Sequence, residues 1–114
     1  MPKVGESRKI LPVRIPKPAT LRRYGLTVEG WRAICERQGW CCAVCRKVPP
    51  NGRLCLDHEH VKGWKRMKAE QRATFVRGIL CTWCNHWYCG RGITVEKAEN
   101  VVAYLVAYEE RNRR

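Results

Sequence analysis

Apolar residues recur at helical spacing in the first third of the chain. Trp31, Ile34 and Cys35 lie at positions i, i+3 and i+4, which predicts a short amphipathic helix that buries these three side chains. Thr27 is a suitable N-cap for this helix, and Gly39 can end it. The pattern therefore predicts a helix with its start, its end and its buried face.

A second helical pattern covers residues 94–114 and is the clearest in the chain. Thr94 can cap its start, and the basic end of the segment complements the helix dipole. Five apolar residues form one face at helical spacing. They are Ala98, Val101, Val102, Leu105 and Tyr108.

Between these helices the pattern changes to the alternation that is typical of strands. "RLCLDH" (53–58) alternates apolar and polar residues, and "VRGIL" (76–80) is a short apolar run, so each predicts a strand. In a regular strand, Asp57 and His58 would project to opposite faces of the sheet. The two side chains can therefore serve one site only if the strand ends or distorts there.

Two segments are mostly polar and basic. Residues 61–75 fit a short helix and a mobile basic loop equally well. Residues 1–22 are rich in proline and basic residues, which predicts an extended arm that builds no core and serves either as a phosphate contact or as a solubilising tail. The expected organisation is this arm, a domain over residues 23–93, and the C-terminal helix over 94–114.

The charge balance points to a polyanionic partner. Lys and Arg number 23 against 10 acidic residues, a net charge of +13, and nucleic acid is the commonest such partner, with an anionic membrane surface as the rival. The longest apolar run, residues 101–108, is shorter than the roughly 20 residues of a membrane span. The N-terminus lacks an apolar signal region. We expect a soluble cytoplasmic protein with no membrane partner.

The chain has eight cysteines, for which a reducing compartment favours metal binding over disulfides. The pairs Cys42-x₂-Cys45 and Cys81-x₂-Cys84 predict one tetrahedral zinc site, with a redox CxxC as the alternative. Cys42 is preferred to its neighbour Cys41 because only Cys42 forms CxxC with Cys45. Four thiolates leave no position for water, so this zinc would be structural. The other cysteines are expected to be packed thiols: Cys35, Cys55 and Cys89.

The order of these motifs closely resembles the endonuclease VII family of phage recombination nucleases, part of the HNH or His-Me finger group. The resemblance covers about residues 24–108 and rests on "YGLT" (24–27), "CAVC" (42–45), "LDHEH" (56–60), "VRGILCTWCN" (76–85) and the closing helix. It implies an α+β fold, namely a small zinc-stapled ββα-metal (His-Me finger) domain with flanking helices.

The resemblance also implies a catalytic site. Asp57 and Asn85 would ligate Mg²⁺, with Mn²⁺ as a substitute, and His58 would be the general base. His60 could equally contact phosphate or ligate metal. Each residue has a structural alternative: Asp57 as a turn cap, His58 as a packed histidine, and Asn85 as a helix cap that leaves the catalytic role to His86.

DNA contacts are expected on the basic residues near this site. Arg77 is a candidate phosphate clamp, although an ordinary surface arginine is the default. Trp64 is expected to pack rather than to stack on a base, and Glu59 to be solvated. Residues 65–75 are an insertion relative to the family pattern, which bears on substrate preference. Four residues could follow a DNA backbone: Lys62, Lys65, Arg66 and Lys68.

The predicted function is a Mg²⁺-dependent DNA endonuclease that resolves branched DNA such as Holliday junctions and leaves 5′-phosphate and 3′-hydroxyl ends. The protein would be phage-encoded and act in the bacterial cytoplasm, and a homodimer is left open. The alternatives are an HNH nickase that acts on ordinary duplex and a non-catalytic, zinc-stabilised nucleic-acid-binding protein.

Overall fold

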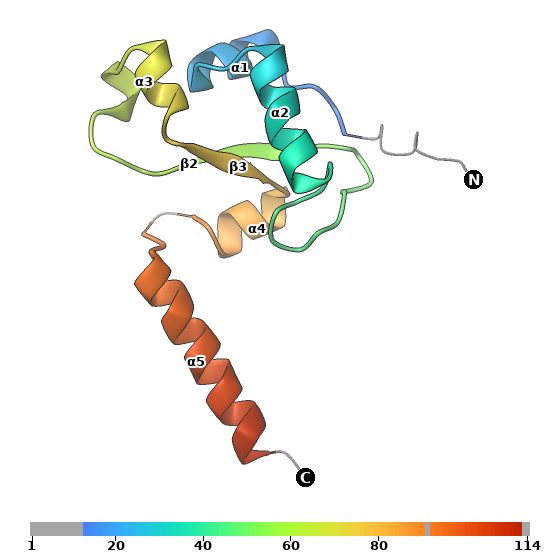
Figure 1. The fold of residues 1–114 in the computed structure, drawn as a ribbon, viewed down its shortest axis with the longest axis vertical. Coiled ribbons are helices and arrows are strands. Elements are labelled where there is room, and N and C mark those ends of the chain that lie inside the picture. Colours follow the sequence, from blue (N-terminus) through green and yellow to red (C-terminus); the bar gives the residue numbers. More distant parts are fainter. Residues whose placement is uncertain (1–12, 91, 113–114) are drawn as a thin grey trace, which may run out of the picture.

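A two-stranded antiparallel sheet forms the centre of the computed structural model, which describes residues 13–90 and 92–112. Helix α2 packs on strand β3, and helix α4 contacts both strands (Figure 1). The elements are α1 (Pro18–Tyr24), α2 (Val28–Gln38), β2 (Cys55–His58), the 3₁₀ helix η2 (Trp64–Arg66), α3 (Ala69–Ala73), β3 (Val76–Leu80), α4 (Thr82–Trp87) and α5 (Val95–Arg111).

The register of the sheet is interrupted at the sequence "LDH". Asp57 pairs with Gly78 but His58 pairs with Val76, so Arg77 is an extra residue on β3 and forms a bulge. Both predicted strands are confirmed, the first beginning at Cys55. Strand β2 ends at His58, and the extra residue of the bulge lies on β3.

Helix α2 has the predicted boundaries and buried face. The Thr27 hydroxyl accepts a hydrogen bond from the Gly30 N–H at 3.0 Å, and Gly39 ends the helix with a positive φ of 74°. The predicted stripe lies in the core: Trp31, Ile34 and Cys35.

Gln38, at the end of α2, ties this helix to the sheet. Its side-chain amide accepts a hydrogen bond from the Ile79 N–H at 2.9 Å and donates one to the Ile79 carbonyl at 2.9 Å. A Cβ atom on Gly78 would lie 2.3 Å from the Gln38 Oε1 atom, so this contact requires glycine. The side chain therefore satisfies backbone groups that a third strand would otherwise satisfy.

The predicted extended arm is wrong for residues 18–22, which belong to α1. Proline near the first position of a helix is compatible with helical φ, and Gly25 ends α1 in the left-handed conformation. Leu21 and Val13 are buried in the core with exposures of 5% and 8%. The proline pattern predicted extension, but burial of these two side chains stabilises a packed segment. Residues 1–12 of the predicted arm lie outside the described residues.

The inserted segment folds into η2 and α3 and packs against α1, so the helical alternative is confirmed. The Arg72 guanidinium donates hydrogen bonds to the carbonyls of Arg23 at 2.7 Å and Arg22 at 3.2 Å. A Cβ atom on Gly25 would lie 2.0 Å from the Ala69 carbonyl oxygen, which shows how closely α1 and α3 approach. The insertion is thus held to the body of the domain.

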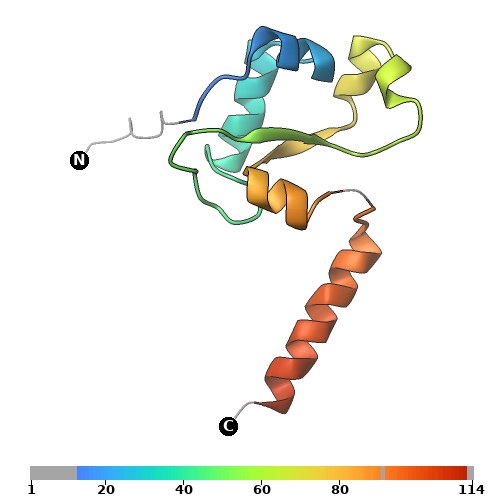
Figure 2. The same ribbon diagram turned by 180° about the vertical axis from the view of Figure 1, so that it is seen from behind.

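Helix α5 extends away from the rest of the domain (Figures 1 and 2). Thr94 caps it by accepting a hydrogen bond from the Lys97 N–H at 3.1 Å, as predicted. The predicted apolar face is exposed, with Val101 at 56% and Leu105 at 52%. Among the described residues, no helix is both long and apolar enough to cross a bilayer.

Candidate active site and metal centre

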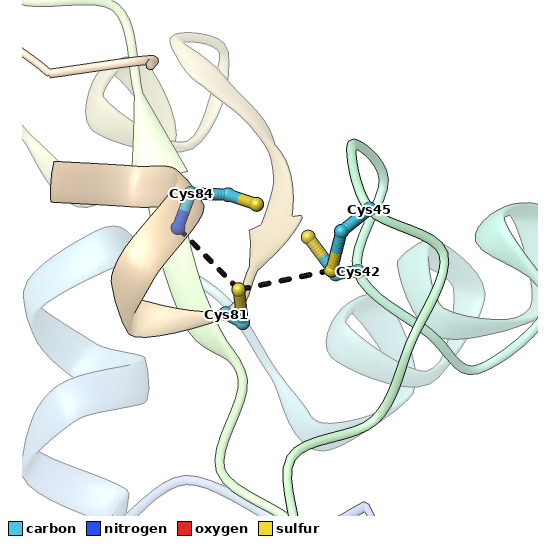
Figure 3. A group of neighbouring side chains, drawn as sticks. All are labelled: Cys42, Cys45, Cys81 and Cys84. Atoms are coloured by element: carbon cyan, nitrogen blue, oxygen red, sulfur yellow. Dashed lines mark hydrogen bonds between the residues drawn. The ribbon is translucent and has the colours of Figure 1, made fainter. Parts of the chain in front are cut away.

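The predicted cysteine pairs converge on one point, where α4 meets the loop between α2 and β2 (Figure 3). The four Sγ atoms of Cys42, Cys45, Cys81 and Cys84 all lie within 4.8 Å of one another. Those of Cys45 and Cys81 are 3.9 Å apart. Four thiolates around a tetrahedral zinc would be roughly 3.8 Å apart, given a Zn–S bond of about 2.3 Å. The cluster is therefore arranged to hold a metal ion.

Backbone N–H groups donate hydrogen bonds to two of these sulfur atoms. The Val44 N–H donates to the Cys42 Sγ at 3.4 Å, and the Cys84 N–H donates to Cys81, the N-cap of α4, at 3.4 Å. Burial opposes ionisation of Cys42, but hydrogen bonds from the backbone lower its pKa to about 6. Burial raises the pKa of Cys84 far above its usual range. The lowered pKa of Cys42 favours the thiolate, the form that binds metal.

The choice of Cys42 over Cys41 agrees with the structure. The Cys41 thiol donates instead to the Gln38 carbonyl at 3.3 Å. Cys35 is a fully buried core residue, as predicted, and Cys89 packs against the core. Cys55 is half-buried, with its Sγ 3.6 Å from the Thr82 hydroxyl.

Asp57 and Arg77, both predicted site residues, are bound to each other. The Arg77 Nε donates to Asp57 Oδ2 at 2.8 Å, and Nη2 donates to Oδ1 at 3.1 Å. Nη2 also donates to the Cys89 carbonyl at 3.2 Å. Asp57 is only 6% exposed, whereas the Arg77 side chain is 37% exposed. The bulge at Arg77 explains the pairing because it turns this side chain to the same side as Asp57.

His58 lies in an aromatic environment. Its ring stacks on Trp64 with centroids 4.0 Å apart and on His60 at 4.7 Å, and Tyr24 meets its edge at 5.5 Å. Burial lowers the pKa of His58 below the ordinary value for imidazole, and His60 acts in the same direction. The neutral imidazole is therefore favoured. Trp64 is buried, as predicted, and takes part in this packing.

The remaining predicted residues are distributed over neighbouring cavities. Asn85 and His60 line a cavity of about 640 Å³ together with His86. His60 also lines a cavity of about 480 Å³ with His58. Asp57 lines a third, of about 310 Å³, so none of these three cavities contains Asp57, His58 and Asn85 together. His60 is thus shared by the cavity of His58 and the cavity of His86.

The predicted DNA-binding residues divide in the same way. Lys65 and Arg66 line the cavity of His58 and His60, whereas Lys62 and Lys68 are exposed but do not line it. Glu59 is exposed, as expected.

A basic groove was missed because its residues are far apart in the sequence. It has a volume of about 550 Å³ and includes Asn85 in its wall. The signal in the sequence was only scattered positive charge, partly within the predicted arm. The cationic residues of the groove are Arg14, Lys17, Arg23 and Arg53.

Comparison with known proteins decides the family. A family model described as recombination endonuclease VII matches residues 18–109. The chain belongs to the recombination endonuclease VII family. The resemblance drawn from "LDHEH" and the two CxxC pairs is thereby confirmed, and the match reaches into α1.

Two proteins with similar sequences come from phages. The Gene 59 protein of Mycobacterium phage D29 is 36% identical over 89 residues, which cover 75% of this chain and 46% of that protein. The Gene 59 protein of Mycobacterium phage L5 is 37% identical over 73 residues, covering 61% of this chain and 37% of that protein. The chain thus spans less than half the length of either relative. No solved structure matches it significantly.

Proposed function

We propose that this chain is a Mg²⁺-dependent endonuclease that cuts branched DNA, including Holliday junctions. Membership of the recombination endonuclease VII family is the observation that carries the proposal. The net charge of +13 and the basic groove beside Asn85 suit a DNA substrate. The relatives are proteins of mycobacterial phages, so the bacterial cytoplasm is the proposed place of action.

The cysteine cluster is proposed to hold a structural Zn²⁺. It would fix α4 to the loop after α2, and so fix Asn85, which directly follows Cys84. Four sulfur ligands close the coordination sphere. Zinc would therefore position the site without taking part in the chemistry.

His58 is proposed as the general base that takes a proton from the attacking water. A neutral imidazole is suited to this role near pH 7. Hydrolysis of the phosphodiester would leave 5′-phosphate and 3′-hydroxyl ends. His60, which shares a cavity with His58 and another with Asn85, is proposed to contact the scissile phosphate or to complete the metal site.

Asp57 and Asn85 are proposed to hold Mg²⁺. One carboxylate and one amide oxygen suit this ion, which would stabilise charge on the scissile phosphate and the leaving 3′ oxygen. Asp57 is bound to Arg77, so a cation can reach this carboxylate only if Arg77 moves or shares it. Helix α4 contacts both strands, which brings the element that carries Asn85 against the sheet that carries Asp57.

A second copy of the chain is the proposed partner of α5. This helix leaves its apolar face exposed, and burial of that face would favour self-association. Two-fold pairing would also supply the two active sites that a symmetric junction needs for two cuts.

One observation favours a non-catalytic DNA-binding protein as the second candidate. The Asp57 carboxylate is already neutralised by Arg77, and it does not share a cavity with His58 or Asn85. An HNH nickase on ordinary duplex is the alternative within the nuclease class.

Cleavage separates these candidates. The purified protein would be incubated with a labelled four-way junction and a matched linear duplex, with and without added Mg²⁺, beside His58→Ala. Mg²⁺-dependent cuts at the junction that are lost in the variant would support the proposal. Equal cutting of both substrates would indicate a duplex nickase. Binding without cutting by either protein would leave a DNA-binding module.

A further inference from the structure

Helix α4 carries an exposed aromatic patch, which we define as Trp83, Trp87 and Tyr88. Their exposed fractions are 57%, 64% and 52%. The rings contact one another: the centroids of Trp83 and Trp87 are 6.2 Å apart, and Trp83 meets Tyr88 edge to face at 5.3 Å. Large aromatic side chains left in water as a contiguous group usually mark a binding surface.

The aromatic patch lies on the helix that carries Asn85. Cys81 caps α4 and Cys84 lies within it, so a metal ion held by the four cysteines would anchor the helix at both of these positions. Trp87 follows Asn85 by two residues. The His86 ring meets the Trp87 ring at 90° with centroids 4.7 Å apart, which supports the orientation of the indole.

Trp87 and Tyr88 line the 640 Å³ cavity that also contains Asn85 and His60. Lys97 contributes a positive charge to the same wall. The cavity thus joins flat aromatic surfaces, polar groups that can hydrogen-bond a base, and a cation that can contact a phosphate. These three features together match a nucleotide better than an apolar partner.

We propose that the aromatic patch stacks on an unpaired nucleobase next to the scissile phosphate, so that the protein selects DNA with an unpaired or unstacked nucleotide at the cut. The inference rests on the proposed function for its substrate, DNA, and for the position of the cut beside Asn85. In an intact duplex the faces of the bases are covered by their neighbours, whereas a branch point exposes them. Stacking on aromatic side chains contributes to binding without reading the base sequence.

Binding, measured by fluorescence anisotropy without added Mg²⁺, tests the inference apart from cleavage. Three labelled DNAs would be compared: a full duplex, the same duplex with one unpaired adenine, and that DNA with an abasic site in place of the unpaired base. We expect Trp87→Ala to weaken binding of the unpaired-adenine DNA about tenfold and to leave the other two within about twofold. Trp87→Phe should retain most of the preference.

Tyr104→Ala is the matched control because it removes an aromatic ring that is 74% exposed on α5, away from the cavity. Bound metal and thermal unfolding would verify that each variant is folded. An equal loss on all three DNAs, or no loss on any, would overturn the inference. So would a change in sedimentation of Trp87→Ala with unaltered base preference, since the patch would then be a protein interface. Base-dependent binding by a protein that cuts nothing would refute the nuclease proposal and uphold the stacking.

Discussion

Arg77 and Asp57 form a two-point ion pair at the bulge of the sheet, with N–O distances of 2.8 and 3.1 Å. The arginine is partly exposed and the carboxylate is buried. Removal of the arginine therefore leaves a buried charge without its main partner, which costs more than the interaction itself contributes.

Arg77→Gln should lower the free energy of unfolding by about 1–3 kcal/mol, as measured by urea denaturation. Arg32→Gln, on the exposed side of α2, is the control and should have little effect. Asp57→Asn combined with Arg77→Gln should recover part of the loss because the buried charge is then absent. Equal stability of wild type and Arg77→Gln would show that the pair contributes nothing to the fold.

The metal cluster can be tested with adjacent cysteines. Cys42→Ser removes a ligand, so it should lower both the bound zinc and the temperature of thermal unfolding, because a metal ion in the cluster would link α4 to the loop after α2. Cys41→Ser should retain both properties, since Cys41 bonds to the Gln38 carbonyl instead. Metal analysis and calorimetry would measure them. If the two variants behaved alike, the choice of Cys42 over Cys41 as the metal ligand would be wrong.

Gly25 and Gly39 have nearly the same positive φ, 73° and 74°, but different surroundings. Gly39→Ala should cost only the strain of the left-handed conformation, about 1–2 kcal/mol. Gly25→Ala should cost clearly more in the same denaturation experiment, because its Cβ would also meet the Ala69 carbonyl at 2.0 Å. Similar losses would mean that α3 moves away from α1 easily and that the insertion is not firmly held.

His58→Ala should reduce the rate of cleavage by about 10²–10⁴-fold if His58 is the general base. DNA affinity and bound zinc should stay close to those of the wild type. The ring also packs against Trp64 and Tyr24, so His58→Asn, which retains some of the volume, would separate loss of the base from loss of packing. Full activity in both variants would remove His58 from the mechanism.

What the sequence revealed depended on the range of the interactions concerned. Helix α2 was predictable because its cap, its end and its buried stripe are all local. The cysteine cluster was predictable because the spacing of metal ligands is a direct chemical requirement. Helix α1 was not predicted, because the burial of Leu21 depends on core residues that are distant in the sequence. The pairing of Arg77 with Asp57 depends on a β-bulge, which the local alternation of apolar and polar residues did not predict. The family resemblance named the site residues, but not the contacts that surround them.

The final prediction compares the basic residues that line the groove with the basic residues that the sequence pattern indicated as DNA contacts. Arg14 and Arg53 line one groove with Asn85, although 39 positions separate them, whereas Lys62 and Lys68 line none of the cavities described. The double variant Arg14→Gln, Arg53→Gln should therefore weaken DNA binding and reduce the slope of log K against log salt by about 2, one for each lost phosphate contact. Lys62→Gln, Lys68→Gln removes the same charge and is the matched control. If both pairs reduced the slope equally, net charge alone would govern binding, and the groove would not be the path of the DNA backbone.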